Sequence, residues 1–231
     1  MLTMQELLLL HGAIGSMDQF IDLDRSLQES FIVHSINFNG HGDSPMNSKP
    51  FSIELFADEV LLFLNKHEIE TIHIFGYSMG GYIAMYLANQ HPHRINKIIT
   101  LGTKFKWDEA TATKENQMLQ PEKIEELLPA FASSLQKRHA PNDWKIVLKK
   151  TADMLTNMGK SNPVKLNDFK TIHHQILLML GDRDKMVTMD ETLQIYKSLP
   201  HAQLAILPNT QHPIELANID RLVNEIKTFL P

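Results

Sequence analysis

The sequence contains no cysteine among its 231 residues. This absence excludes a disulfide framework, a zinc site with thiolate ligands and a cysteine nucleophile. A chain without cysteine suits a reducing compartment, and Glu6 stands where a signal peptide would carry basic residues. We therefore expect a cytoplasmic protein.

Long hydrophobic runs and an excess of positive charge are also missing. The longest aliphatic run covers only residues 7–10, far short of the roughly 20 residues of a membrane-spanning helix. Lys and Arg total 22 against 27 Asp and Glu, which gives a formal net charge of −5. This balance leaves no electrostatic footprint for nucleic acid or anionic lipid, so neither partner is expected.

The length and apolar content favour one domain. An apolar fraction of 43% in 231 residues is enough for one substantial core, and the chain is too short for two ordinary domains with a linker. Repeats, low-complexity tracts and Pro-rich linkers are absent from the sequence. We expect a single domain over residues 1–231 that carries an inserted subdomain.

Short apolar runs alternate along the chain with longer segments of helical period. This alternation is typical of an α/β protein with a mostly parallel sheet and helices on both faces. Six strands are predicted, over residues 7–10, 31–38, 71–75, 97–101, 175–180 and 202–207. Helices are expected after Ser52, which can cap one, over residues 78–90, and near the end from Ile219 to Leu230.

One stretch interrupts the alternation. From about residue 104 to 170 no strand pattern occurs, and helical patterns cover residues 121–137 and 142–158. We interpret this stretch as a helical cap inserted into the domain. Its apolar residues can face the main domain or a pocket below it, and core packing is expected for most of them: Leu127, Phe131, Leu135, Trp144, Val147, Leu148 and Leu155.

The strongest local signal is a G-x-S-x-G motif at residues 76–80, between a predicted strand and a predicted helix. Such a sharp turn forces the serine into a strained conformation, so small residues are needed two positions before and after it. Gly76 and Gly80 meet this need. Because Ser78 then lies at a helix N-terminus, which favours developing negative charge, it is a candidate nucleophile.

A serine nucleophile needs a base and a group that orients the base. On this kind of turn the chain order is serine, then acid after a late strand, then histidine after the last strand. Asp182 and Asp184 follow the strand that ends at Leu180, and His212 follows the strand that ends at Leu207. The sequence therefore supplies a histidine base and two candidate acids.

An oxyanion hole needs one backbone N–H from the residue after the nucleophile and another from a loop after an early strand. Met79 supplies the first. The second is expected from Ala13 in the loop that follows residues 7–10, where Gly12 allows a tight turn.

Together these motifs resemble the α/β-hydrolase superfamily, specifically its small single-domain esterase and haloperoxidase-like branch with a helical cap. The resemblance covers nearly the whole chain and includes residues 39–44 after the second strand. It implies that the acid is the third residue after Gly181, which selects Asp184 over Asp182. Most relatives have two further strands before the first strand found here, so an N-terminally truncated sheet is expected. Relatives usually carry Asp and Arg where this chain has Asn37 and Asn39, so neutral hydrogen bonds should replace ionic anchoring of that loop.

Metal binding is disfavoured despite twelve histidines. His173 and His174 would point to opposite faces of a strand, and no carboxylate cluster completes a site near them or near His91 and His93. No metal and no cofactor are expected.

The sequence thus predicts a serine hydrolase that cleaves a small ester or related acyl compound through an acyl-enzyme, with Ser78, Asp184 and His212 as the triad. Two alternatives stay open. The same fold serves carbon–carbon bond hydrolases and lyases, and some members bind ligands without turnover.

Overall fold

The computed structural model describes residues 4–230 and contains a six-stranded sheet in which every pairing is parallel. The strands run in the order β2-β1-β3-β4-β5-β6. Their bounds are β1 Gln5–Leu10, β2 Phe31–Ser35, β3 Ile72–Tyr77, β4 Ile95–Leu101, β5 Ile176–Gly181 and β6 Ala202–Leu207. The predicted α/β class and the six strands are confirmed.

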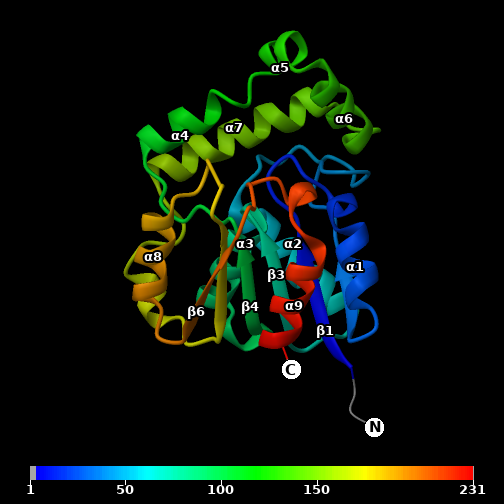
Figure 1. Cartoon of the computed structure of the whole chain (residues 1–231). Helices are drawn as coiled ribbons and strands as arrows, with labels where there is room; N and C mark the ends of the chain where they lie inside the picture. Colours follow the sequence, from blue (N-terminus) through cyan, green and yellow to red (C-terminus); the bar gives the residue numbers. More distant parts are fainter. Residues whose placement is uncertain (1–3, 231) are drawn as a thin grey trace.

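Helices cover both faces of the sheet (Figure 1). Side chains alternate between faces along β1, so Leu7 and Leu9 lie in one apolar cluster while Leu8 and Leu10 lie in the other. The first cluster includes α1 and α9, and the second includes α2, α3 and α8. The helix bounds are α1 Ile21–Leu27, α2 Ile53–Lys66, α3 Met79–Gln90, α8 Met189–Ser198 and α9 Ile219–Phe229.

The predicted helix ends agree with the structure where a cap was identified. Ser52 caps α2 through its hydroxyl, which accepts a hydrogen bond from the Leu55 N–H at 3.1 Å. The C-terminal helix packs on the sheet through Leu222 and Ile226, both fully buried. The second strand is shorter than predicted and ends at Ser35, although Phe38 beyond it remains buried. The apolar pattern there therefore marks a buried loop as well as a strand.

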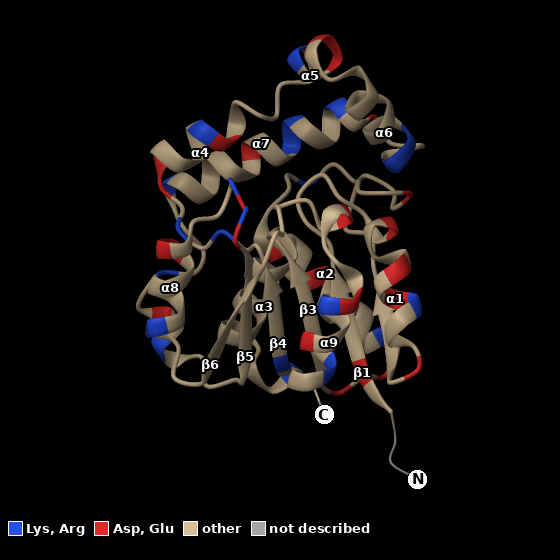
Figure 2. Cartoon of the chain, viewed as in Figure 1, with Lys and Arg blue, Asp and Glu red and all other residues tan. Residues whose placement is uncertain are grey.

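Between β4 and β5 the described chain forms helices joined by loops and no strand, and the helices lie over the carboxyl ends of the strands (Figure 1). We call these helices the cap: α4 Glu109–Asn116, α5 Pro121–Leu127, α6 Pro129–His139 and α7 Trp144–Lys160, followed by a short 3₁₀ helix, Asp168–Thr171. Figure 2 shows charged residues of both signs on these helices. No helix within residues 4–230 combines the length and apolar character needed to cross a membrane.

The helical pattern over residues 121–137 forms two helices. It is divided into α5 and α6, because Leu128, which precedes Pro129, adopts φ −136° and ψ 57° outside the helical region. Among the apolar cap residues that were singled out, Leu127 and Phe131 are 68% and 39% exposed. The other apolar cap residues that were singled out are buried: Leu135, Trp144, Val147, Leu148 and Leu155.

Candidate active site

Ser78 lies in the sharp turn that joins β3 to α3. Its backbone has φ 51° and ψ −115°, a conformation that glycine adopts at the first central position of a type II′ turn and that other residues rarely adopt. A Cβ on Gly80 would lie 2.1 Å from the Leu10 carbonyl oxygen, and one on Gly76 would lie 2.4 Å from the Gly81 nitrogen. Larger residues at these two positions would therefore force the turn apart.

Hydrogen bonds on both sides hold the Ser78 backbone in place. Its N–H donates to the Leu101 carbonyl at 2.8 Å, and its carbonyl accepts from the Thr103 hydroxyl at 3.0 Å. The neighbouring strand end thus stabilises a backbone conformation that costs of order 1–3 kcal/mol elsewhere.

Replacing Ser78 with glycine is expected to raise the free energy of unfolding by about 1 kcal/mol. Glycine adopts this φ without strain. The strain energy that is relieved in the folded state exceeds the roughly 0.5–1 kcal/mol by which the greater conformational entropy of glycine stabilises the unfolded chain. Chemical denaturation of Ser78→Gly beside Ser78→Ala measures the difference, since both lack the hydroxyl. A Ser78→Gly protein less stable than Ser78→Ala would show that the turn stores no strain.

Asp184 and His212 form a hydrogen-bonded pair. Asp184 lies in the loop after β5 and His212 in the loop after β6, and the His212 Nδ1–H donates to Asp184 Oδ2 at 2.8 Å. The other carboxylate oxygen accepts the N–H groups of Met186 and Val187 at 2.8 and 2.9 Å. Burial alone would raise the pKa of Asp184, but the hydrogen bonds from His212 and from these two N–H groups outweigh it and lower the pKa. The carboxylate is therefore ionised at neutral pH.

Asp182, the other candidate acid, bonds to Thr210 rather than to His212. Its side chain is 35% exposed and accepts the Thr210 N–H at 3.2 Å. It thereby ties the loop after β5 to the loop that carries His212.

The loop after β4 lies between the serine turn and the Asp184–His212 pair. A Cβ on Gly102, which has φ 58°, would lie 3.1 Å from Asp184 Oδ2 and 3.3 Å from His212 Nδ1. The His212 ring also lies beside Tyr77, with ring centroids 5.5 Å apart. Within residues 4–230 no hydrogen bond joins the Ser78 hydroxyl to His212, a contact that often tightens only when substrate binds.

The loop after β1 contacts the serine turn. A Cβ on Gly12 would lie 3.2 Å from the Ser78 Cβ, and the Gly15 N–H donates to the Gly12 carbonyl at 3.1 Å, closing a tight turn around Ala13. Among the described residues neither the Ala13 N–H nor the Met79 N–H donates to a protein acceptor. The two N–H groups expected for an oxyanion hole therefore have no protein acceptor among the described residues.

Three buried histidines lie behind this loop, namely His11, His41 and His139. The ring centroids of His11 and His41 are 5.1 Å apart, and those of His41 and His139 are 5.7 Å apart. Burial lowers the pKa of His11 and His139 to about 4 and that of His41 well below its ordinary value. The three rings are therefore neutral and act through hydrogen bonds.

The loop after β2 is held by amide side chains, as expected from its sequence. The Asn37 amide donates to Asp43 at 2.8 Å and its oxygen accepts the Met17 N–H at 2.8 Å. The Asn39 oxygen accepts the Asn47 N–H at 3.3 Å.

Two cations connect the cap to the loops of the site. Lys104 Nζ donates to the Met186 carbonyl at 2.6 Å and lies 3.6 Å from a carboxylate oxygen of Glu115 and of Glu191. In α6, Arg138 donates to Glu215 at 3.0 Å, three residues after His212. Both side chains are only 15–16% exposed, so these bonds are partly shielded from water.

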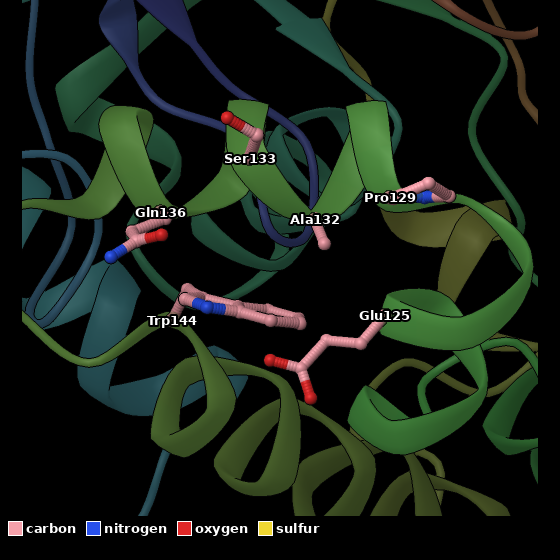
Figure 3. Close-up of a pocket in the computed structure, with 6 residues that line it drawn as sticks. All are labelled: Glu125, Pro129, Ala132, Ser133, Gln136 and Trp144. Atoms are coloured by element: carbon pink, nitrogen blue, oxygen red, sulfur yellow. The ribbon is translucent and has the colours of Figure 1, made fainter.

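An open pocket in the cap is separate from these residues. It lies between α5, α6 and α7 and is lined by Glu125, Pro129, Ala132, Ser133, Gln136 and Trp144 (Figure 3). The Glu125 carboxylate is engaged with Lys145 at 2.7 Å. None of the residues that line the pocket belongs to the serine turn or the Asp184–His212 pair, and we assign the pocket no chemical role.

The chain belongs to the alpha/beta hydrolase fold family, whose model matches residues 6–146. A putative 2-succinyl-6-hydroxy-2,4-cyclohexadiene-1-carboxylate synthase of Bacillus subtilis is 26% identical over 251 residues, covering 96% of this chain and 89% of that protein.

Two other similar proteins carry hydrolase names. A pimeloyl-[acyl-carrier protein] methyl ester esterase of Neisseria meningitidis serogroup C is 36% identical over 91 residues, which covers 39% of this chain and 33% of that protein. The structure of 2-hydroxy-6-oxo-6-phenylhexa-2,4-dienoate hydrolase from Rhodococcus sp. strain RHA1 superposes with a TM-score of 0.82 at 19% identity, covering 98% of this chain and 90% of that chain. The structural likeness establishes the shared fold.

Proposed function

We propose that the protein is a serine hydrolase that cleaves a small ester or related acyl compound, with Ser78 as nucleophile, His212 as base and Asp184 as the orienting acid. The observation that carries the proposal is the 2.8 Å bond from His212 Nδ1–H to the buried Asp184 carboxylate. This bond fixes the tautomer in which Nε2 carries the lone pair and can accept a proton from a serine.

The reaction follows from these positions. His212 Nε2 takes the Ser78 proton as the serine oxygen bonds to the substrate carbonyl carbon. The N–H groups of Ala13 and Met79 stabilise the resulting oxyanion. His212 then gives the proton to the leaving alkoxide as the acyl-enzyme forms. His212 Nε2 then takes a proton from water as the water oxygen bonds to the acyl carbon. The bond to the serine oxygen breaks, the proton returns to Ser78, and the carboxylic acid is released. Every proton and electron pair is accounted for without a cofactor.

A second candidate is carbon–carbon bond cleavage or a lyase-type reaction on a small molecule, in which Ser78 and His212 act together as a base. It is supported by the Bacillus subtilis relative, which covers 96% of this chain and is named as a synthase rather than an esterase. Such an enzyme would leave simple activated esters intact.

The test is intact mass spectrometry after treatment with a fluorophosphonate, which phosphonylates serines that a base and an oxyanion hole activate. We expect one adduct on the wild type and on Ser133→Ala, a substitution of an exposed cap serine, and none on Ser78→Ala. A folded wild type without adduct would overturn the proposal. Labelling without turnover of p-nitrophenyl esters of increasing acyl length would favour the second candidate.

A further inference from the structure

The oxyanion loop, residues 12–15, contains a residue in an unfavourable backbone conformation. Ile14 has φ 53°, in the left-handed region that β-branched residues rarely enter. Such a conformation costs of order 1–3 kcal/mol and persists only where surrounding contacts enforce it. The Ala13 N–H shares its peptide plane with the Gly12 carbonyl, which accepts the Gly15 N–H at 3.1 Å. Because Ile14 lies inside this turn, the contacts that hold Ile14 help to fix the plane that carries the Ala13 N–H.

His139, the last residue of α6, makes the hydrogen bond to this residue. The ring is fully buried, its Nε2 lies 3.0 Å from the Ile14 carbonyl oxygen, and its Nδ1 accepts the Gly42 N–H at 3.1 Å. Because Nδ1 is the acceptor, Nε2 carries the proton and donates it to Ile14. One neutral ring thus bridges the loop after β1 and the loop after β2.

Other cap residues reinforce this contact. The Asn142 amide donates to the carbonyls of Gly42 and Ser44 at 3.1 and 2.8 Å, and so fixes the second loop from the same side. The Ile14 side chain packs against the apolar cluster of the cap, which includes Leu135 and Trp144. In Figure 1 the loop after β1 lies directly beneath the α6 end of the cap. The cap therefore holds Ile14 through both its side chain and its carbonyl.

We propose that His139 is a positioning residue, which keeps Ile14 in its left-handed conformation and thereby aims the Ala13 N–H at the oxyanion. The cap and the oxyanion hole are then connected through the His139 side chain. This inference rests on the proposed serine-hydrolase function.

The test compares His139→Gln with His139→Met. The two side chains have similar length and shape, but glutamine offers an acceptor for the Gly42 N–H and a donor for the Ile14 carbonyl, whereas methionine offers neither. Loss of a whole oxyanion donor lowers kcat by about 10² to 10³. We expect His139→Met to lower kcat for an activated ester by at least about 10-fold, with KM changed by less than about threefold. His139→Gln should recover kcat to within about threefold of the wild type.

The matched control is Asn116→Ala, which removes two hydrogen bonds between α4 and α7 and touches neither loop. It should leave kcat unchanged. A kcat for His139→Met within twofold of the wild type would overturn the inference, as would equal losses in the Gln and Met variants. Should His139→Met not fold, His139→Asn replaces it, because its amide is one methylene shorter and cannot reach both partners.

Failure of the inference differs from failure of the proposed function. In the first case the wild type hydrolyses esters and labels with fluorophosphonate, and the His139 variants do so at the same rate. In the second case the wild type itself does not turn over esters, whether or not it is labelled.

Discussion

Replacement of Ser78 by alanine is expected to lower kcat for activated esters by on the order of 10⁶, the loss typical of a serine nucleophile whose triad acts as a unit. The covalent route disappears with the hydroxyl, and only the free N–H groups of Ala13 and Met79 remain to act on bound ester. Assays of p-nitrophenyl acetate hydrolysis over a wide range of enzyme concentration measure kcat for the variant and the wild type.

Folding should be unaffected, since the Ser78 backbone bonds to Leu101 and Thr103 do not involve its hydroxyl. Circular dichroism and an unchanged denaturation midpoint provide the control. Turnover within tenfold of the wild type in a folded Ser78→Ala protein would disprove the nucleophile assignment.

Asp184→Asn is expected to lower kcat by about 10⁴, the cost of holding the histidine in the wrong tautomer. If the amide oxygen keeps the N–H groups of Met186 and Val187, the amide NH₂ faces His212 and cannot accept its Nδ1–H. The ring then moves its proton to Nε2, which can no longer take a proton from Ser78.

Asp182→Asn is the matched control two residues away. Its amide oxygen can still accept the Thr210 N–H, so kcat should stay within about threefold of the wild type. Measuring kcat for the two purified variants side by side tests which aspartate is the acid. A larger loss for Asp182→Asn than for Asp184→Asn would reverse the assignment of the acid.

The sequence predicted those features that local chemistry determines. Six apolar runs gave the strands, because a parallel sheet buried on both faces needs continuous apolar segments. The glycines around Ser78 indicated the sharp turn, and the structure gives the contacts that make Gly76 and Gly80 necessary.

Features that depend on contacts between distant segments could not be predicted. His139 lies 125 residues from its partner Ile14, and nothing in the local sequence of α6 distinguishes it from a surface histidine. The helix α4 was missed because its short sequence has no apolar stripe, although Asp108 caps it by accepting the Thr111 N–H. The division at Pro129 could have been found from the restriction that proline places on Leu128.

The Lys104 contacts bear on how such caps are exchanged during evolution or by protein engineers. Lys104 lies where the chain leaves the sheet for the cap, and its ammonium group holds the Met186 carbonyl, while the Met186 N–H supports Asp184. A chimera that swaps the whole insertion at its ends would therefore remove a support of the acid together with the cap helices. A graft whose first junction follows Lys104 would preserve that support, so the segment that can be exchanged begins after Lys104.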